Sequence, residues 1–188
     1  MTRPVKQSVR SISGSFSDAV KATVKVFKGS HPRERTHLKS PLRYPGGKTR
    51  GVKEIIKYFP PDLERVCSPF LGGGSIEIEL ANKGVEVFGY DIFEPVTDFW
   101  QILLKDPKTL ADLVRKYYPL TSSKFYSLQL EYGKIRSKKE RAAVFFVLNR
   151  ASFSGATLSG GMSPGHPRFT DTAIERLESF TLDNLHHD

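Results

Sequence analysis

A glycine-rich turn followed by an acid is the pattern in this sequence that best predicts chemistry. The run Gly72-Gly73-Gly74-Ser75 follows a short apolar segment, and Asp91 comes 19 residues after Gly72, at the end of a second apolar segment. Glycines at such a turn let a ligand approach the backbone closely, because no Cβ stands in the way. An acid about 20 residues further on accepts the ribose hydroxyls of a bound nucleotide. The spacing favours an adenosine-type ligand, and a tight turn with a surface aspartate is the alternative.

The glycine pattern also narrows the kind of ligand. The strict G-x-G-x-x-G of dinucleotide sites is absent, because Ser75, Ile76 and Glu77 follow the glycines. A ligand without phosphates, such as S-adenosylmethionine, therefore fits better than a dinucleotide. Gly46-Gly47-Lys48-Thr49 lacks the first glycine of a phosphate-binding loop, since Leu42 stands in that position. This second pair of glycines is better explained as bringing Lys48 toward an anion such as a carboxylate.

The elements that must position these residues form a βαβ unit. A strand is expected at 65–67, a helix at 76–83 and a second strand at 85–90, so the two strands are parallel with a right-handed crossover. Helices are expected at 53–59, 96–104, 107–117, 122–132, 137–150 and 172–179, with the cap of the last one at Thr172. Phe180 to Leu182 is expected to be the start of a third strand. The glycine-rich stretch 151–170 between these helices is typical of a functional loop.

Composition excludes several other classes of protein. A hydrophobic share of 38% is enough for a core, and no apolar run is long enough to cross a membrane. The run Ala142 to Leu148 fits a buried helix instead. The single cysteine, Cys67, excludes an internal disulfide, and the histidines have no ligand spacing, so we expect no metal site.

The positive charge is concentrated at the N-terminus. Residues 1–40 hold nine Lys or Arg against two Asp or Glu, a net +7 of the chain's +9. This segment is predicted to be a basic flexible arm that lies along phosphates. A solvated tail and an organelle transit peptide are the alternatives. We expect an intracellular protein, acting in the cytoplasm or at the nucleoid.

Four segments in order resemble one family. These are Arg43-Tyr44-Pro45-Gly46-Gly47-Lys48, Ser68-Pro69-Phe70-Leu71-Gly72-Gly73-Gly74-Ser75, Tyr90-Asp91-Ile92 and Leu148-Asn149-Arg150-Ala151-Ser152-Phe153-Ser154-Gly155. Together, over residues 41–185, they resemble the Dam-type (D12 class) DNA adenine-N6 methyltransferases. The resemblance implies an α/β, Rossmann-like S-adenosylmethionine-dependent methyltransferase fold with a helical and loop DNA-recognition insert.

The resemblance also implies which residues form the sites. In the S-adenosylmethionine site, Asp91 would take the ribose hydroxyls and Lys48 the methionine carboxylate, and the full set is Tyr44, Gly46, Gly47, Lys48, Pro69, Phe70, Gly72, Gly73, Gly74, Ser75, Asp91 and Ile92. The residues expected to face double-stranded DNA are Lys138, Asn149, Arg150, Ser152, Phe153, Ser154 and Arg168.

Three of these DNA residues also fit roles that involve no DNA. Lys138 belongs to a basic run at a helix start, where cations oppose the helix dipole, so phosphate contact and plain solvation are both open. For Arg150, three roles are open: a hydrogen bond to a guanine edge, contact with a phosphate, or capping of its own helix. For Phe153, two roles are open: stacking or insertion between DNA bases, or filling of the protein core.

The sequence departs from the family pattern in two ways. Ser68 stands where the family usually has Glu, Tyr44 where it often has Trp, and Ile92-Phe93 where it has Ile-Asn. More important, the chain contains no copy of the Asp-Pro-Pro-Tyr tetrapeptide. In such enzymes the tetrapeptide polarises the adenine amine and stacks on the flipped base. No catalytic residue is therefore predicted within this chain.

The sheet of this fold would then be incomplete. The first strand is expected to be central, and the strand that carries the tetrapeptide would flank its other side, leaving an open edge. We expect a second polypeptide to supply the remaining strands and the tetrapeptide. A truncated relic or a fragment is the alternative.

These observations predict a cofactor-binding and DNA-recognition subunit of a split, heterodimeric DNA adenine-N6 methyltransferase. The basic arm would cover 1–40, the cofactor-binding α/β part 41–118, the target-recognition part 119–180, and the start of a strand 181–188. A non-catalytic DNA-binding remnant is the main alternative, and an RNA or protein methyltransferase is a weaker one.

Overall fold

The computed structural model describes residues 38–164 and 168–187, all within one unit of the chain. The basic arm predicted for 1–40 therefore lies almost entirely outside the described residues. The strands are β1 (Arg65–Ser68), β2 (Glu86–Gly89) and β3 (Leu185–His186). The helices are α2 (Val52–Ile56), α3 (Ser75–Asn82), α4 (Glu94–Lys105), α5 (Pro107–Arg115), α6 (Ser122–Glu131), α7 (Lys138–Ala151) and α8 (Asp171–Glu178). Two short 3-10 turns, η1 (Tyr132–Lys134) and η2 (Phe153–Gly155), flank α7.

The three strands form a parallel sheet in the order β1-β2-β3. The predicted βαβ unit is confirmed, because α3 connects β1 to β2 and contacts β2. Two details of the sequence prediction are wrong. The strand expected at Phe180–Leu182 is irregular, and the chain joins the sheet only at Leu185. Helix α8 is capped by Thr170, whose hydroxyl accepts from Ala173 N, and not by Thr172.

One edge of this sheet is uncovered in the part of the chain that the structure describes. Strand β1 pairs with β2 on one side, and no described strand pairs with its other side. The side chains of β1 alternate between exposed and partly exposed, and Cys67 is exposed. In contrast, Val87 in β2 is fully buried. An uncovered edge presents unpaired N–H and C=O groups to any strand that approaches it.

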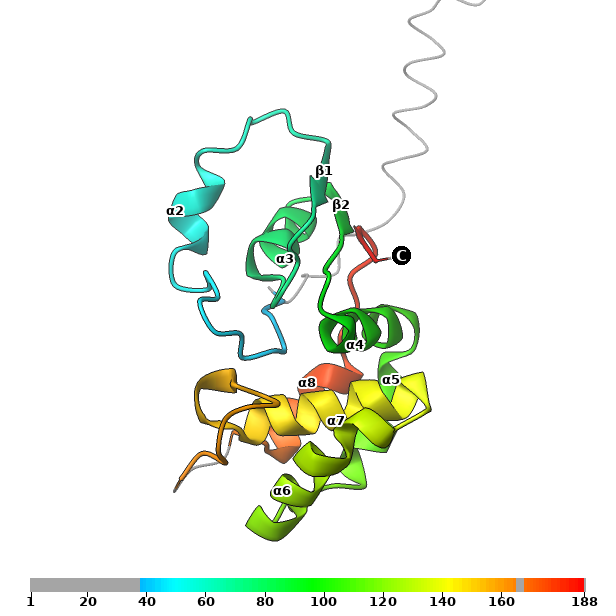
Figure 1. Cartoon of the computed structure of the whole chain (residues 1–188). Helices are drawn as coiled ribbons and strands as arrows, with labels where there is room; N and C mark the ends of the chain where they lie inside the picture. Colours follow the sequence, from blue (N-terminus) through cyan, green and yellow to red (C-terminus); the bar gives the residue numbers. More distant parts are fainter. Residues whose placement is uncertain (1–37, 165–167, 188) are drawn as a thin grey trace, which may run out of the picture. The chain divides into compact units, whose positions relative to one another are not determined.

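Helices α4, α5, α6 and α8 gather around α7 in a second layer, as Figure 1 shows, whereas α3 packs against the sheet and α2 against α3. Helix α7 contacts α4, α5 and α6, and α5 also contacts α8. The apolar run Ala142–Leu148 is buried along its whole length, which confirms the buried helix predicted there. Four aromatic rings from α4 and α7 pack at the centre of this layer: Phe99, Trp100, Phe145 and Phe146. Helices α4 and α5 thus pack with the recognition part, and the predicted boundary at 118 stays a prediction.

Candidate cofactor and nucleic-acid sites

The glycine turn joins the end of β1 to the start of α3. Gly72 and Gly74 have positive φ angles of 49° and 65°, a backbone conformation that side chains disfavour. A Cβ on Gly74 would also lie 2.8 Å from Cζ2 of Trp100, whose indole Nε1 donates to Gly72 O at 2.8 Å. The fully buried Trp100 therefore holds the turn in place, both by packing against Gly74 and by its hydrogen bond to Gly72. The protein's own packing thus requires these glycines.

The acid at the end of β2 lies directly against this turn. Asp91 Oδ2 accepts from the backbone N–H of Gly72 at 2.7 Å, and Oδ1 accepts from Phe93 N at 2.9 Å. The two residues that are 19 positions apart in the sequence are therefore in contact. Each carboxylate oxygen has more than one acceptor position. Asp91 can thus hold the turn and still accept a ligand hydroxyl.

The segment around Tyr44 folds over the same turn. A Cβ on Gly72 would lie 3.0 Å from Cε1 of Tyr44, and one on Gly73 would lie 2.8 Å from its Cβ. Ser40 Oγ donates to Gly73 O. Burial, and then the negative charge of Asp91, raise the pKa of the Tyr44 phenol. The structure therefore brings the first three predicted cofactor segments together at one place.

A cavity of about 270 Å³ opens at this place. Its lining includes nine of the twelve predicted cofactor residues: Tyr44, Gly46, Gly47, Lys48, Phe70, Gly72, Gly73, Gly74 and Ser75. Pro69, Asp91 and Ile92 are not part of the lining, and Asp91 reaches the turn through its bond to Gly72. The volume falls just below the roughly 300–1,000 Å³ of typical ligand sites. The cavity lined by the described residues is thus slightly smaller than a typical ligand site.

Two of the predicted cofactor side chains are largely exposed to solvent. Phe70 is 81% exposed and Ile92 is 95% exposed. Lys48 Nζ donates to Gly46 O at 2.7 Å within its own loop. Large apolar side chains that stand in water next to an open site commonly mark a surface that another group covers.

Glu77 also lines the cavity, although the sequence patterns did not identify it as a site residue. It is 9% exposed, and Ser68 Oγ donates to its Oε1 at 2.6 Å. Burial raises the pKa of the Glu77 carboxyl, although hydrogen bonds from Ser68 and from the backbone N–H groups of Glu77 and Ile76 oppose that rise. The signal in the sequence was an acid two residues after the end of the glycine turn.

The predicted DNA residues are divided between two ends of α7. The helix places Lys138 about 18 Å from Arg150, at 1.5 Å per residue. Lys138 contacts Gln101 and lies 3.5 Å from the buried Asp98, which also binds Arg141 at 2.6 Å. These pairs explain why cations stand at a helix N-terminus. DNA contact by Lys138 stays a prediction.

Asn149 is buried and holds the Tyr44 segment in place. Its Oδ1 accepts from Arg43 N at 2.8 Å, and its Nδ2 donates to Arg43 O at 2.8 Å and to Thr157 Oγ1 at 3.0 Å. Asn149 is 1% exposed, so the side chain is occupied by the protein itself. Its predicted DNA contact is untested. The geometry gives it a second role, which is to join α7 to the segment that carries Tyr44.

Arg150 stands among other arginines. Its Nε donates to Arg168 O at 3.1 Å and its Nη1 to Pro41 O at 3.3 Å. Burial and the positive charges of Arg43, Arg168 and Arg176 lower the pKa of Arg150 to about 10. No ion pair joins any of these four arginines to an acid of residues 38–164 or 168–187. Such a cluster attracts an anion.

The loop after α7 presents Phe153 to solvent. Phe153 N donates to Gly161 O at 2.8 Å, and Ser152 pairs with Met162 across an isolated β-bridge. Ser152 is fully buried, Ser154 has a φ of 52°, and the Phe153 side chain is 64% exposed. The alternative in which Phe153 fills the core is therefore wrong. Its contact with DNA stays a prediction.

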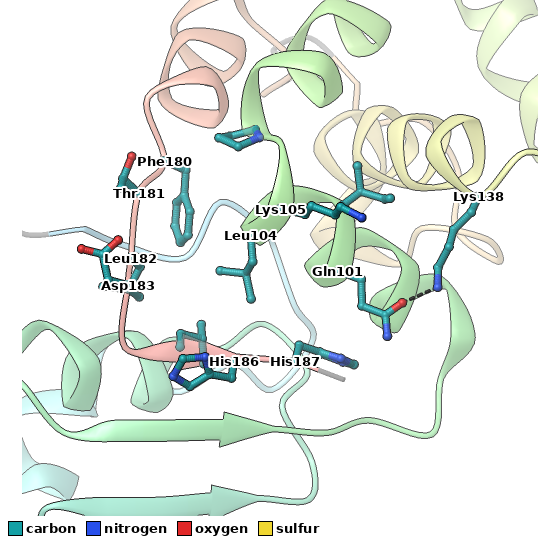
Figure 2. A pocket seen from close by; sticks show the side chains of 13 residues that line it. Gln101, Leu104, Lys105, Lys138, Phe180, Thr181, Leu182, Asp183, His186 and His187 are labelled. Atoms are coloured by element: carbon teal, nitrogen blue, oxygen red, sulfur yellow. Dashed lines mark hydrogen bonds between the residues drawn. The ribbon is translucent and has the colours of Figure 1, made fainter.

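A larger cavity than the one at the glycine turn lies elsewhere among the described residues. It has a volume of about 840 Å³ and is bounded by α4, the first residue of α7 and the segment 180–187. Figure 2 shows Lys138 and Gln101 on one side of it and Phe180 to Asp183 on the other. It contains none of the predicted cofactor residues. Cavity size alone does not locate the predicted site.

Metal-binding and membrane-spanning features are absent from the described ranges 38–164 and 168–187. No group of three or more His, Cys, Asp or Glu residues there is arranged to hold a metal ion. No helix in this part of the chain combines the length and the apolar character needed to cross a membrane.

Comparison with known proteins identifies the family to which these segments correspond. Residues 44–164 match the D12 class N6 adenine-specific DNA methyltransferase family. The DNA N-6-adenine-methyltransferase of Escherichia phage P1 is 26% identical over 175 residues, which is 85% of this chain and 23% of the phage protein. The type II methyltransferase M.FokI of Planomicrobium okeanokoites is 33% identical over 70 residues, which is 37% of this chain and 11% of that protein. The chain thus spans less than a quarter of the length of these two relatives.

Proposed function

The chain belongs to the D12 class N6 adenine-specific DNA methyltransferases, and we propose that it is the cofactor-binding and DNA-recognition subunit of a split enzyme of that class. The proposal has three parts, which concern the cofactor, the DNA and the missing catalytic tetrapeptide. The observation that carries it is the contact between the glycine turn and Asp91, covered by the Tyr44 segment.

The cofactor proposed for the cavity is S-adenosylmethionine. Asp91 would bind the ribose hydroxyls, and the backbone of the Gly72–Ser75 turn would lie against the adenosyl group. Lys48, which needs only to leave Gly46 O, would bind the methionine carboxylate. Pro69, Phe70 and Ile92 would cover the adenine side of the Rossmann-like site. The residues present fit this ligand because the turn and the Tyr44 segment line one cavity, with Asp91 bonded to the backbone of Gly72.

The DNA surface is proposed to lie at the C-terminal end of α7. Arg43, Arg150, Arg168 and Arg176 gather there without acidic partners among the described residues, and Phe153 stands exposed beside the same helix end. Positive charge without a counter-ion favours contact with DNA phosphates. Ser152 and Ser154 flank Phe153, and Asn149 would act by holding the surface in shape.

A second polypeptide is proposed to complete the enzyme. None of the 188 residues forms an Asp-Pro-Pro-Tyr segment, and the edge of β1 is open among the described residues. Phe70 lines the cofactor cavity and is exposed, as is Ile92 shortly after the end of β2. A strand from a partner that paired with β1 would cover this edge and bring the tetrapeptide to the cofactor.

The proposed reaction proceeds inside the cell on a base turned out of the duplex. S-adenosylmethionine supplies a methyl group that the adenine N6 amine attacks in line, so that the C–N bond forms as the C–S bond breaks and the amine loses a proton. This chain's residues would bind and orient the cofactor and the DNA, and no covalent enzyme intermediate is involved.

A non-catalytic, DNA-binding protein is the second candidate, favoured by the missing tetrapeptide. The two are separated by an assay of tritiated methyl transfer to adenine in duplex DNA. The chain, a polypeptide from the same genome that contains Asp-Pro-Pro-Tyr, and their mixture are assayed in parallel. We expect transfer only in the mixture. A mixture that binds DNA but transfers no methyl group supports the second candidate and contradicts the split enzyme.

A further inference from the structure

The start of helix α3 borders the cofactor cavity, and it carries its own negative group. The first N–H groups of a helix, together with its dipole, normally form a site for phosphate. Here Gly74 at the N-cap provides no side chain to satisfy them. The Glu77 carboxyl belongs to the first turn of α3, where the backbone N–H groups of Ile76 and Glu77 lower its pKa against the larger effect of burial.

A hydroxyl from the end of β1 fixes this carboxyl. Ser68 Oγ donates to Glu77 Oε1 at 2.6 Å, so the side chain is tied both to the strand before the turn and to the helix after it. A residue of α3 thus places a negative charge near the end of β1.

The charge of Glu77 is not balanced by a cation of the described residues. Within residues 38–164 and 168–187 it forms no ion pair with Lys or Arg, and the Lys48 ammonium in the same cavity lining donates to Gly46 O instead. Glu77 as a whole is 9% exposed, so solvent offsets little of the cost of burying its charge. A positively charged group in the cavity would lower that cost.

We propose that Glu77 determines the specificity of the cavity, by excluding ligands with phosphates and favouring a nucleoside that carries a positive group. This inference rests on the proposed function, because it assumes that the cavity binds an adenosyl ligand. It adds the reason why that ligand is S-adenosylmethionine, whose ammonium and sulfonium are positive, and not a nucleotide.

The physical reason has two parts. A phosphate at the start of α3 would face a like charge, because the Glu77 carboxyl in the first turn of the helix lines the same cavity. A cationic ligand would pair with a buried carboxylate that has no Lys or Arg partner in the described part of the chain, and buried charges of opposite sign attract more strongly than exposed ones. Neutral adenosine experiences neither effect, so it serves as a reference ligand.

The test measures binding of three ligands to the full chain by calorimetry: S-adenosylmethionine, adenosine and ATP. The wild-type chain should bind ATP at least about tenfold more weakly than adenosine, which is about 1.4 kcal/mol. Glu77→Gln keeps the shape of the side chain and removes its charge. We expect the ratio of the ATP dissociation constant to that of S-adenosylmethionine to fall at least about tenfold in this variant.

Glu79→Gln is the matched control, since it removes the same charge from the same helix but lines a different cavity. It should leave the ratio unchanged. A ratio that is equal in wild type and Glu77→Gln, with adenosine still bound, overturns this inference alone. Wild-type chain that binds neither adenosine nor S-adenosylmethionine overturns the proposed function as well. If Glu77→Gln does not fold, the inference is tested by the wild-type chain alone, through its dissociation constants for adenosine and ATP. Wild-type chain that binds ATP as tightly as it binds adenosine overturns the inference.

Discussion

The cofactor side and the DNA side of this molecule are built by different means. At the cofactor side, backbone groups make the site, through the Gly72–Gly74 turn and its bond to Asp91. At the DNA side, the side chains at one helix end differ in burial. Asn149 and Ser152 are buried in the protein, whereas Phe153 is exposed to solvent. A site made of backbone follows from local sequence, whereas a site made of side chains depends on which way each one turns.

Both sides meet at the Tyr44 segment. Asn149 holds Arg43 at the DNA side, and the next residue, Tyr44, lies on the glycine turn at the cofactor side. A change on one side can thus reach the other through two adjacent residues. The substitutions below test this comparison, in order of decreasing effect.

Gly74→Ala should produce the largest effect, on the cofactor side. The added Cβ would lie 2.8 Å from the buried Trp100, and the residue would have to adopt a φ of 65°. We expect the free energy of unfolding to fall by about 2–4 kcal/mol, from overpacking and backbone strain together. Thermal unfolding measures the change.

Gly84→Ala is the control for that substitution. Gly84 also has a positive φ, of 94°, but a Cβ there would meet nothing within 4 Å. The loss should be only about 1 kcal/mol, from strain alone. Equal losses at the two positions would show that Trp100 does not hold the turn.

Asn149→Ala should destabilise the chain next most, although the residue was predicted to face DNA. It removes the amide that bonds Arg43 N and Arg43 O, and leaves both backbone groups without that partner. We expect a loss of about 2–3 kcal/mol in the free energy of unfolding. Chemical denaturation with Phe153→Ala as the exposed control measures it, and a stable Asn149→Ala chain with weakened DNA binding would contradict the internal role.

Arg168→Gln and Arg176→Gln should weaken DNA binding while leaving stability nearly unchanged. Loss of a phosphate contact should lower affinity on all sequences alike and reduce the slope of log affinity against log salt by about 1 for each residue. Fluorescence anisotropy with a duplex at several salt concentrations measures it. Lys138→Gln at the far end of α7, paired with Asp98, should have the smaller effect. A larger effect of Lys138→Gln than of the two arginine substitutions would contradict a DNA surface at the C-terminal end of α7.

The pH dependence of stability should show the smallest effect. Burial raises the pKa of the Glu77 carboxyl above its ordinary value of 4.5, so this group binds a proton more tightly in the folded chain than in the unfolded chain. Its contribution to the free energy of unfolding is therefore present at low pH and is lost as pH rises through the raised pKa. The melting temperature of Glu77→Gln minus that of wild type should increase from about pH 4 to pH 7. A difference that is constant or decreases over this range would show that the carboxyl is not destabilised by burial.

The sequence was informative where structure is local. The strands, the helix between them and Asp91 follow from apolar patterns and spacing, and the segment 142–148 is buried as expected. Prediction from the sequence failed where the structure depends on contacts between residues that are far apart in the chain. Nothing near Phe180 shows that the chain joins the sheet only at Leu185, beside Val87. The burial of Asn149 depends on Arg43, 106 residues away, and the role of Glu77 depends on a hydroxyl across the turn.

The most direct test of the central claim is a calorimetric titration of S-adenosylmethionine into the wild-type chain and into Asp91→Ala, each first shown to be folded. If the glycine turn and Asp91 hold the adenosyl group, the wild type binds and the variant loses about 1–3 kcal/mol of binding free energy, the cost of lost hydrogen bonds to a charged acceptor. Equal affinity in the two chains would contradict the assignment of this acid, and no binding by the wild type would contradict the site itself.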